Sequence, residues 1–367
     1  MCGNKKKKIV IITNHSYMFW QFRRELVAEL QKENEVVLGM PFVGHEEDFT
    51  QMGVRCVEIG MERRSINPST DLQLIKTYWK LLKSEKPDIV ITYSIKPNIY
   101  AGLICSILKI PYFANVQGLG TAFQKKGLAF IATILYKLAF IKVQNVFFEN
   151  SVNAKEFRAR HIMKKEKQTV LCGAGINTEH YSLEPYPYHE HAHFLYLGRI
   201  MKEKGIDELF AAVRRLHKEG YEFVLDMVGF FEDEYQAQVK ELEKLGIVKF
   251  HGFQPDTRPF YKNASCVVLP SYHEGMSNVL LEAAATGRPL ITSNIPGCRE
   301  AVEHGKTGIL VKVKDSESLY KAMKRFLTIS AEKRATMGIA GREKMEQEFK
   351  KEKVVAETLK VLGMKAK

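Results

Sequence analysis

Short apolar runs of strand length alternate with helical patterns twice along the chain, and this alternation most strongly constrains its fold. In the first series the strand-like runs are Lys8–Thr13, Glu35–Met40, Val54–Ile59, Asp88–Tyr93, Tyr112–Gln117 and Val143–Phe148. Helical patterns lie between them, for example at 19–32, Leu72–Leu82 and Asn98–Leu108. Short apolar strands separated by helices are typical of a parallel sheet that is covered on both faces.

A polar stretch rich in Pro, Tyr and His, Glu184–His191, interrupts the alternation and is expected to be a hinge or linker. A second series of strand-like runs follows: His193–Leu197, Phe223–Val228, Val248–Phe253, Cys266–Leu269 and Pro289–Thr292. Its helices are expected near 205–218, 232–245, 278–286 and 318–328, with a charged helical segment from Ala331 to the end. A chain of 367 residues can bury two cores, so we expect two tandem α/β domains of the Rossmann type. Ligands of such sheets bind at the carboxyl ends of the strands.

The net charge of +13 is unevenly distributed: ten Lys or Arg residues lie between Lys125 and Lys167, against three glutamates. One interpretation is a set of solvated helix faces. The other is attraction to an anionic membrane surface or to a phosphate-bearing substrate. Nucleic acid is not the expected partner, because the basic residues alternate with aliphatic ones and no aromatic stacking platform or nucleic-acid motif is present.

Within this region Gly127–Lys142 is apolar nearly all round but shorter than the roughly 20 residues that a transmembrane helix needs. It is either a buried core helix or an interfacial helix that inserts one apolar face into lipid. Nothing at the start of the chain resembles a signal peptide. The six cysteines are scattered without a C-x-x-C pair, and we expect buried, reduced thiols in a cytoplasmic protein.

The stretch Ser271–Glu282 follows the apolar run Cys266–Pro270, leads into a helical pattern, and carries two glutamates, Glu274 and Glu282. A glycine-containing loop before a helix exposes backbone N–H groups, and the helix N-terminus adds positive potential. The two carboxylates can accept hydrogen bonds from hydroxyls of the same ligand. A sugar nucleotide fits this pattern, since it has hydroxyls at both ends and a diphosphate between them.

The second series opens with another loop of chemical interest, Gly198–Gly205, which has two glycines and the cations Arg199, Lys202 and Lys204 before a helix. Arginine offers a planar fork to phosphate oxygens, lysine a point charge, and the helix N-terminus a third positive element. A diphosphate leaving group gains negative charge in the transition state, so cations fixed there lower the barrier.

No D-x-D motif of the kind that binds a divalent metal is present. The acidic trio Glu232-Asp233-Glu234 is interpreted as favourable charge at a helix N-terminus. Arg199 and Lys204 supply the countercharge that a metal would give, so we expect neither a metal nor another cofactor.

Taken together, Gly198-Arg199…Lys204-Gly205, Glu274-x7-Glu282, Gly287-Arg-Pro-Leu and Glu300…Gly308 resemble glycosyltransferase family 4, whose members are retaining enzymes of the two-domain GT-B fold. The resemblance implies that Arg199 and Lys204 hold the donor diphosphate, that Glu274 lies beside the transferred sugar, and that Glu282 binds the ribose hydroxyls. The other residues that it implies for the donor site are Gly198, Gly252, Phe253, Gly275, Met276, Ser277, Asn278 and Val279.

In the first half, Ile91–Pro97, Asn115–Thr121 and Gly175–Asn177 resemble bacterial enzymes that extend lipid-linked surface glycans. This resemblance implies a UDP-linked hexose or N-acetylhexosamine donor and a polyprenyl-diphosphate-linked glycan acceptor. It also implies contact with an anionic membrane through 122–167, at the inner face of the cytoplasmic membrane. The expected domains are 1–184 for the acceptor, 192–348 for the donor, and a helix at 349–367 that returns to the first domain.

One position departs from the family pattern: many members carry a histidine where this chain has Gln117 or its neighbours. Glutamine cannot act as a general base, so the proton acceptor is either unidentified or the departing phosphate oxygen itself. The acceptor-side candidates are Asn14, His15, Gln117 and Gly118, and His15 fits a capping or packing role equally well. The alternatives are a soluble glycosyltransferase for another acceptor, a nucleotide-sugar epimerase and a non-catalytic basic binding protein.

Overall fold

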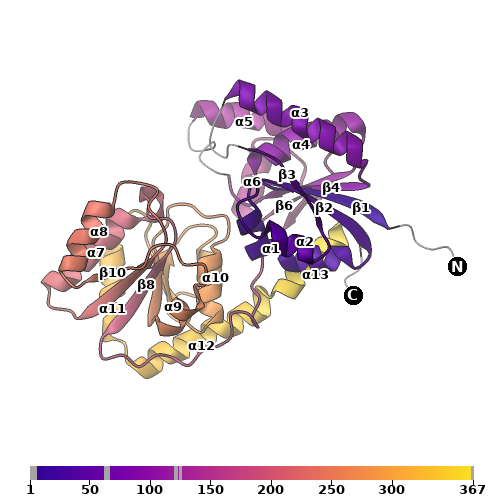
Figure 1. The fold of residues 1–367 in the computed structure, drawn as a ribbon. Helices are drawn as coiled ribbons and strands as arrows, with labels where there is room; N and C mark the ends of the chain where they lie inside the picture. Colours follow the sequence, from indigo (N-terminus) through magenta and orange to yellow (C-terminus); the bar gives the residue numbers. More distant parts are fainter. Residues whose placement is uncertain (1–5, 62–66, 120–122, 124–125, 365–367) are drawn as a thin grey trace. The chain divides into compact units, whose positions relative to one another are not determined.

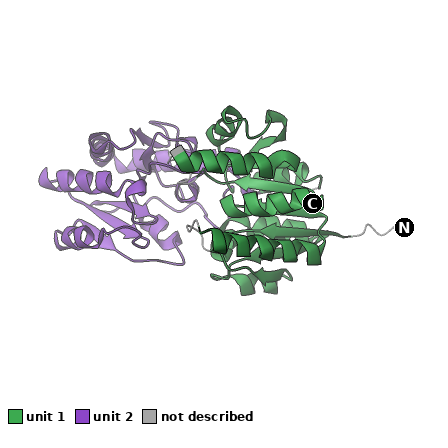
Figure 2. Cartoon of the chain, turned by 90° about the horizontal axis from the view of Figure 1, so that it is seen from above, with its two compact units in different colours: residues 1–174, 352–367 green, residues 175–351 purple. Residues whose placement is uncertain are grey.

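The computed structural model describes residues 6–61, 67–119, 123 and 126–364. Figure 2 shows the two compact units into which the chain divides. Unit 1 comprises residues 1–174 and 352–367, and unit 2 comprises residues 175–351.

Unit 1 contains a seven-stranded parallel sheet with the strand order β3-β2-β1-β4-β5-β6-β7. Its strands are β1 (Lys7–Ile12), β2 (Asn34–Met40), β3 (Arg55–Glu58), β4 (Ile89–Tyr93), β5 (Tyr112–Val116), β6 (Asn145–Phe148) and β7 (Gln168–Val170). Its helices are α1 (Ser16–Gln31), α2 (Glu46–Gln51), α3 (Pro68–Glu85), α4 (Ile95–Leu108), α5 (Lys126–Ala139), α6 (Ser151–Ala159) and most of α13 (Lys351–Val361). The six strands expected in this half are all present, and β7 is additional.

The apolar runs form strands because the sheet buries both of their faces. In β1, Val10 and Ile12 pack into one core cluster while Ile9 and Ile11 pack into another. Between the strands, side-chain caps set where helices begin: Asn67 accepts a hydrogen bond from the Ser69 N–H at 3.1 Å, and Asn150 accepts one from Asn153 at 2.8 Å.

The C-terminal helix α13 packs on the sheet of unit 1, as Figure 1 shows. Val354, Val355, Leu359 and Leu362 join the cluster that contains Ile9 and Ile11. Phe349, by contrast, packs in the core of unit 2, because α12 ends at Glu348 and a short bridge joins Lys350 to Ile176 before α13 begins.

Unit 2 contains a six-stranded parallel sheet with the order β10-β9-β8-β11-β12-β13. Its strands are β8 (Ala192–Leu197), β9 (Phe223–Val228), β10 (Val248–Phe250), β11 (Cys266–Leu269), β12 (Leu290–Ser293) and β13 (Gly308–Val311). Its helices are α7 (Ile206–Lys218), α8 (Gln236–Lys244), α9 (Arg258–Asn263), α10 (Asn278–Ala285), α11 (Ser316–Thr328) and α12 (Ala331–Glu348). All five strands expected here are present, and β13 is additional.

In both sheets the chain starts near the middle and later continues on the other side of its first strand. This switch lies between β1 and β4 in unit 1 and between β8 and β11 in unit 2. On either side of a switch point the loops run in opposite directions away from the carboxyl edge of the sheet, which leaves room for a ligand. Both Rossmann-like units therefore have a candidate binding edge of their own.

The expectation of buried cysteines is only partly correct. Cys105, Cys266 and Cys298 are buried, but Cys56 is half-buried and Cys172 is exposed. Cys172 follows the short strand β7, where the chain leaves the sheet.

Candidate functional site

At the carboxyl edge of the unit 2 sheet, the chain segments after β8, β9 and β10 are in direct contact. The Gly229 N–H donates to the Gly252 carbonyl at 2.8 Å, and the Gly198 N–H donates to the Val228 carbonyl at 3.0 Å. A Cβ at position 229 would lie 1.9 Å from the Gly198 carbonyl oxygen, so only glycine permits this approach. The contact fixes the start of the loop that carries Arg199.

The loop Gly198–Gly205, called the cation loop, also packs against the segment that begins at Ser271 and carries Glu274, called the glutamate loop. The two loops follow β8 and β11, the strands on either side of the switch point. Gly205 has φ +75°, and a Cβ there would lie 2.2 Å from the Pro270 carbonyl oxygen. Lys204 Nζ donates to Glu274 Oε1 at 2.5 Å, and the same oxygen accepts from Ser271 Oγ at 2.8 Å. The structure therefore brings together Lys204 and Glu274, which are seventy positions apart in the sequence.

A third loop, after β12, holds the other end of the glutamate loop. A Cβ at Gly297 would lie 2.4 Å from the Gly275 carbonyl oxygen, and the Ser277 N–H donates to the Gly297 carbonyl at 2.8 Å. Met276 and Ser277 are buried, and Ser277 is the N-cap residue of α10, whose first residues are Asn278 and Val279. The segment expected to contact the donor is thus fixed by backbone contacts on both sides.

The acidic trio after β9 is not part of a helix, and its interpretation as helix-capping charge is wrong. Helix α8 begins at Gln236, with no acidic residue in its first turn. Instead, Glu232 forms an ion pair with Arg199. The Asp233 carboxylate accepts a hydrogen bond from the Lys202 N–H at 2.8 Å. Both carboxylates therefore organise the cationic loop.

Glu282 lies on α10, and its carboxylate contacts a tyrosine hydroxyl, whereas Glu274 contacts the ammonium of Lys204. Its side chain is buried, and its Oε2 accepts a hydrogen bond from the Tyr261 hydroxyl at 2.7 Å. Burial raises the pKa of Glu282 to about 7, although hydrogen bonds from Tyr261 and Tyr181 oppose this shift. These two tyrosines were not singled out from the sequence, where nothing distinguishes them from core aromatic residues.

Two exposed phenylalanines lie at neighbouring strand ends of unit 2. Phe253 follows β10 directly after Gly252, and Phe230 follows β9 directly after Gly229. An exposed aromatic ring at a binding edge offers a face on which a nucleobase can stack. Phe253 was expected near the base, and Phe230 is a further candidate that the sequence analysis did not name. An aromatic residue next to a strand-ending glycine was the available signal.

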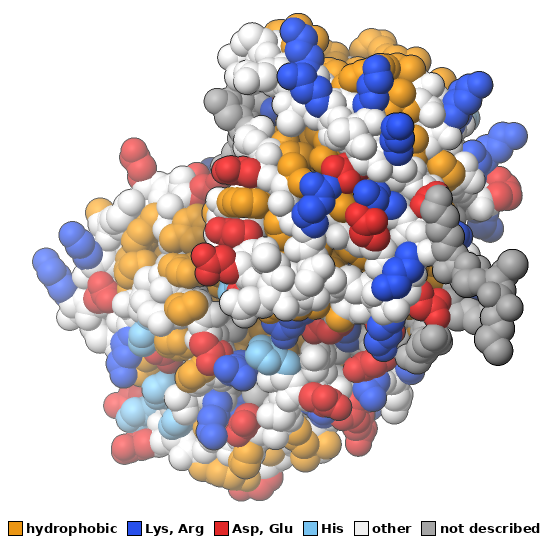
Figure 3. Space-filling view, turned by 45° about the vertical axis from the view of Figure 1, so that its right-hand side comes forward, with side chains coloured by type: hydrophobic (Ala, Val, Ile, Leu, Met, Phe, Trp, Pro, Cys, Tyr) orange, Lys and Arg blue, Asp and Glu red, His pale blue; other side chains and the backbone are white. Residues whose placement is uncertain are grey.

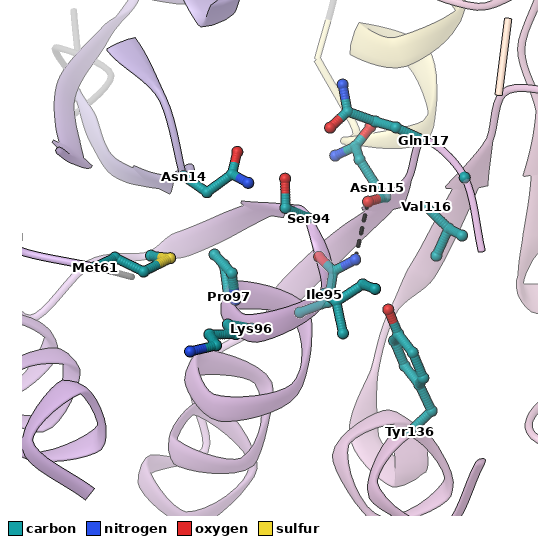
Figure 4. A pocket seen from close by; sticks show the side chains of 12 residues that line it. Asn14, Met61, Ser94, Ile95, Lys96, Pro97, Asn115, Val116, Gln117 and Tyr136 are labelled. Atoms are coloured by element: carbon teal, nitrogen blue, oxygen red, sulfur yellow. Dashed lines mark hydrogen bonds between the residues drawn. The ribbon is translucent and has the colours of Figure 1, made fainter. Parts of the chain in front are cut away.

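Unit 1 has a pocket of about 220 Å³ at its own switch point, shown in Figure 4. Asn14 comes from the end of β1, Gln117 and Gly118 from the end of β5, and Ser94 and Lys96 from the start of α4. Three of the four acceptor-side candidates therefore line one pocket. The fourth, His15, is the N-cap residue of α1 but makes no side-chain capping bond, and it is absent from the pocket lining.

A buried polar network fixes the wall of this pocket. The Asn98 side chain accepts from the Thr92 hydroxyl at 2.7 Å and donates to the Asn115 carbonyl at 2.9 Å, the bond dashed in Figure 4. Ser94, between β4 and α4, has φ +76°, a left-handed backbone that costs a non-glycine residue about 1–3 kcal/mol. The Lys96 ammonium lies 2.8 Å from Asp71. Gly120 and Thr121, from the motif Asn115–Thr121, lie outside the described residues.

Two protein-family models match the chain. Residues 8–150 match the family described as glycosyl transferase 4-like, and residues 185–344 match glycosyl transferases group 1. The two matches cover one α/β unit each for most of its length.

Curated relatives agree with these matches. The chain is 27% identical over 335 residues to N,N'-diacetylbacillosaminyl-diphospho-undecaprenol alpha-1,3-N-acetylgalactosaminyltransferase of Campylobacter jejuni, covering 85% of this chain and 87% of the relative. It is also 27% identical over 302 residues to the capsular polysaccharide biosynthesis glycosyltransferase CapM of Staphylococcus aureus, covering 78% and 79% of the two chains.

Solved structures share the fold over nearly the whole chain. A glycosyltransferase from Rickettsia africae aligns with a TM-score of 0.77 at 16% identity, covering 97% of this chain and 98% of that chain. Anabaena Alr3699/HepE, solved in complex with UDP and glucose, aligns with a TM-score of 0.78 at 16% identity, covering 97% and 99%. The class is thus an enzyme of the GT-B fold. Within that class, the chain belongs to the GT4-like glycosyltransferases.

Proposed function

We propose that this chain is a retaining glycosyltransferase that moves a hexose or N-acetylhexosamine from a UDP-sugar to a hydroxyl of a polyprenyl-diphosphate-linked glycan. The observation that carries the proposal is the contact between Lys204 and Glu274 at the β8/β11 switch, with Arg199 on the same loop. A cation and a carboxylate in contact suit the two parts of a sugar nucleotide, its diphosphate and its sugar hydroxyls.

In the proposed reaction, an acceptor oxygen forms a bond to the anomeric carbon of the donor sugar while the bond from that carbon to the diphosphate oxygen breaks. The acceptor proton goes to the departing phosphate oxygen, so no protein base is needed. Arg199 and Lys204 stabilise the charge that develops on the diphosphate, and Glu274 orients the transferred sugar. Gly198, Phe253 and the segment from Gly275 to Val279 line the donor.

The unit 1 pocket is the proposed place of the acceptor. Its polar lining offers the amides of Asn14 and Gln117, which can donate to and accept from sugar hydroxyls. Gln117 then positions the acceptor and takes no proton. The relative from Campylobacter jejuni is named for a diphospho-undecaprenol-linked substrate, which supports a lipid-linked acceptor for this chain as well.

Membrane contact through α5 is part of the proposal. Across the described residues, no helix is long and apolar enough to cross a membrane. Helix α5 buries Ala129, Ala132 and Tyr136 but exposes large apolar side chains on its other face: Phe130, Ile131, Ile134 and Leu138. The interpretation of α5 as an entirely buried core helix is therefore wrong.

Basic residues accompany this exposed apolar face. Lys137 on α5 and Lys142 just beyond it are both exposed. In Figure 3, hydrophobic side chains interspersed with lysine and arginine side chains lie at the top of the view, where Figure 1 draws α3, α4 and α5. An apolar stripe with flanking cations suits the interface of an anionic membrane. We propose a cytoplasmic enzyme at the inner face of the cytoplasmic membrane.

Flotation with liposomes tests the membrane contact. The wild-type protein should float with anionic vesicles at low salt, and Ile131→Ser should lower partitioning about fivefold, because half of an isoleucine side chain buried in lipid stabilises binding by about 1 kcal/mol. Ile339→Ser on α12 is the matched control, since Ile339 is similarly exposed. Absence of the wild-type protein from the floated fraction would exclude the membrane contact.

The donor is identified by a thermal-shift panel of UDP-, GDP- and ADP-sugars, followed by turnover on synthetic polyprenyl-diphosphate glycans. We expect a UDP-sugar to raise the melting temperature most, and transfer to the lipid-linked acceptor to follow with the same donor. A protein that none of these nucleotide sugars stabilises would contradict the proposed donor site.

A further inference from the structure

Glu282 and the tyrosines Tyr181 and Tyr261 form a cluster that has no part in the bond-making and bond-breaking of the proposed reaction. We propose that Tyr181 and Tyr261 are positioning residues that hold the Glu282 carboxylate as an acceptor for both ribose hydroxyls of the donor, and thereby favour ribonucleotides over 2'-deoxyribonucleotides. This inference rests on the proposed function, because it assigns Glu282 to the ribose of a nucleotide donor.

The hydrogen bond between Tyr261 and Glu282 is completely enclosed. Tyr261 is fully buried on α9, and its hydroxyl donates to Glu282 Oε2 at 2.7 Å. A phenol has one proton to donate, and here that proton is used on the carboxylate. An ionised carboxylate offers about four acceptor positions, so one bond from Tyr261 orients the group and leaves positions for ligand hydroxyls.

Tyr181 reaches the same carboxylate from a different part of the chain. Its ring centroid lies 6.0 Å from that of Tyr261, with the planes at 78°, and its hydroxyl lowers the pKa of Glu282. The turn before it is set by Asn177, whose side chain accepts the N–H groups of Glu179 and His180 at 3.0 and 2.9 Å. Asn177, the last residue of the Gly175–Asn177 motif, thus stabilises the backbone turn that positions Tyr181.

Two arginines lock the backbones that carry these tyrosines. Arg288 is fully buried just after α10, and its guanidinium donates to the Tyr261 carbonyl at 2.8 Å and to the Pro185 carbonyl at 2.8 Å. Arg342 on α12 donates to the Tyr181 carbonyl at 2.8 Å and to the Ala285 carbonyl on α10 at 2.9 Å. Both tyrosines are therefore tied to the helix that carries Glu282, which holds the group rigidly before a ligand arrives.

The charge of the carboxylate depends on these donors. Burial raises the pKa of Glu282 to about 7, while the hydroxyls of Tyr261 and Tyr181 and the charge of Lys351 lower it. A neutral carboxyl accepts hydrogen bonds more weakly than a carboxylate. Nucleotide binding should therefore weaken as the pH falls through this pKa, and loss of a phenol hydroxyl should move that decline to higher pH.

The test is Tyr261→Phe, with binding of UDP and of 2'-deoxy-UDP measured calorimetrically between pH 6 and 9. At pH 7 we expect the affinity of the variant for UDP to be about tenfold lower than that of the wild-type protein. The preference for UDP over 2'-deoxy-UDP should become smaller. The loss of UDP affinity on acidification should begin at a higher pH. Tyr181→Phe should act in the same direction. The control is Tyr320→Phe, which removes a phenol hydroxyl from a buried tyrosine that donates to the partly exposed Glu219, at a carboxylate outside the proposed donor site.

A purely structural role would lower both affinities equally and leave the pH profile unchanged. If Tyr261→Phe and Tyr181→Phe both fold and keep the wild-type ratio of UDP to 2'-deoxy-UDP affinity and the wild-type pH dependence of binding, the inference is wrong. The proposed donor site is not affected by that result. If the wild-type protein binds neither UDP, GDP nor ADP, the proposed function fails, and this inference fails with it.

Discussion

Replacing Lys204 with alanine should lower turnover about 100-fold or more while weakening nucleoside diphosphate binding less than about tenfold. The ammonium of Lys204 lies against Glu274, at the loop that we assign to the donor diphosphate. A fixed cation there interacts most strongly when the leaving group carries its full negative charge, so its removal acts on the transition state more than on the bound donor. Steady-state kinetics together with calorimetric binding of UDP separate the two effects.

Lys202→Ala is the matched control for this variant. Lys202 lies two positions away in the same loop, with its side chain 70% exposed and its ammonium 4.0 Å from Asp207. We expect its removal to change turnover less than about threefold, in keeping with the small contribution of an exposed ion pair. Unchanged turnover of Lys204→Ala would exclude the leaving-group role. A loss confined to binding would assign Lys204 to donor affinity alone.

Replacing Gly205 with alanine should destabilise unit 2 by about 3 kcal/mol, through two contributions. Alanine at a left-handed φ of +75° costs about 1 kcal/mol, and the clash of its Cβ with the Pro270 carbonyl adds about 1–3 kcal/mol. Gly220→Ala is the control, because Gly220 has φ +80° and its added Cβ would meet no atom within 4 Å. Urea unfolding of the two variants therefore isolates the cost of the clash.

The same substitution should also reduce activity. Relief of the clash must move the cation loop away from the glutamate loop, which separates Lys204 from Glu274. Turnover of Gly205→Ala is expected to fall with stability, whereas Gly220→Ala should retain it. Equal free energies of unfolding for the two variants would contradict the close approach of Gly205 to Pro270.

The sequence predicted the two sheets and placed the candidate donor residues after strand ends of the second sheet, because continuous apolar runs are typical of buried parallel strands. It missed β7 and β13, which are short edge strands of three and four residues. It did not predict α2 or α9, each six residues long, because so short a helix has no clear period. Short peripheral helices depend on tertiary contacts that a local pattern does not encode, whereas the short edge strands β3 and β10 were predicted from their apolar runs.

The charged residues of the candidate site were predictable from the sequence, but only some of their pairings were. Lys204 and Glu274 both follow strand ends, so their meeting could be expected once a parallel sheet was inferred. The Arg199–Glu232 pair was misinterpreted because acids before a helical pattern resemble helix caps, whereas the loop after β9 turns them toward the cations. Tyr261 was not identified from the sequence because its hydrogen bond to Glu282 joins α9 to α10, and a local sequence pattern does not encode that tertiary contact.

Transfer of a labelled sugar from a UDP-sugar, measured with and without a polyprenyl-diphosphate-linked glycan, tests the central claim most directly. We predict that label enters the lipid fraction only when the acceptor is present, that UDP is released in equal amount, and that the sugar keeps its anomeric configuration. Conversion of the nucleotide sugar without any acceptor, as an epimerase would perform, or transfer with inverted configuration would contradict the proposed reaction.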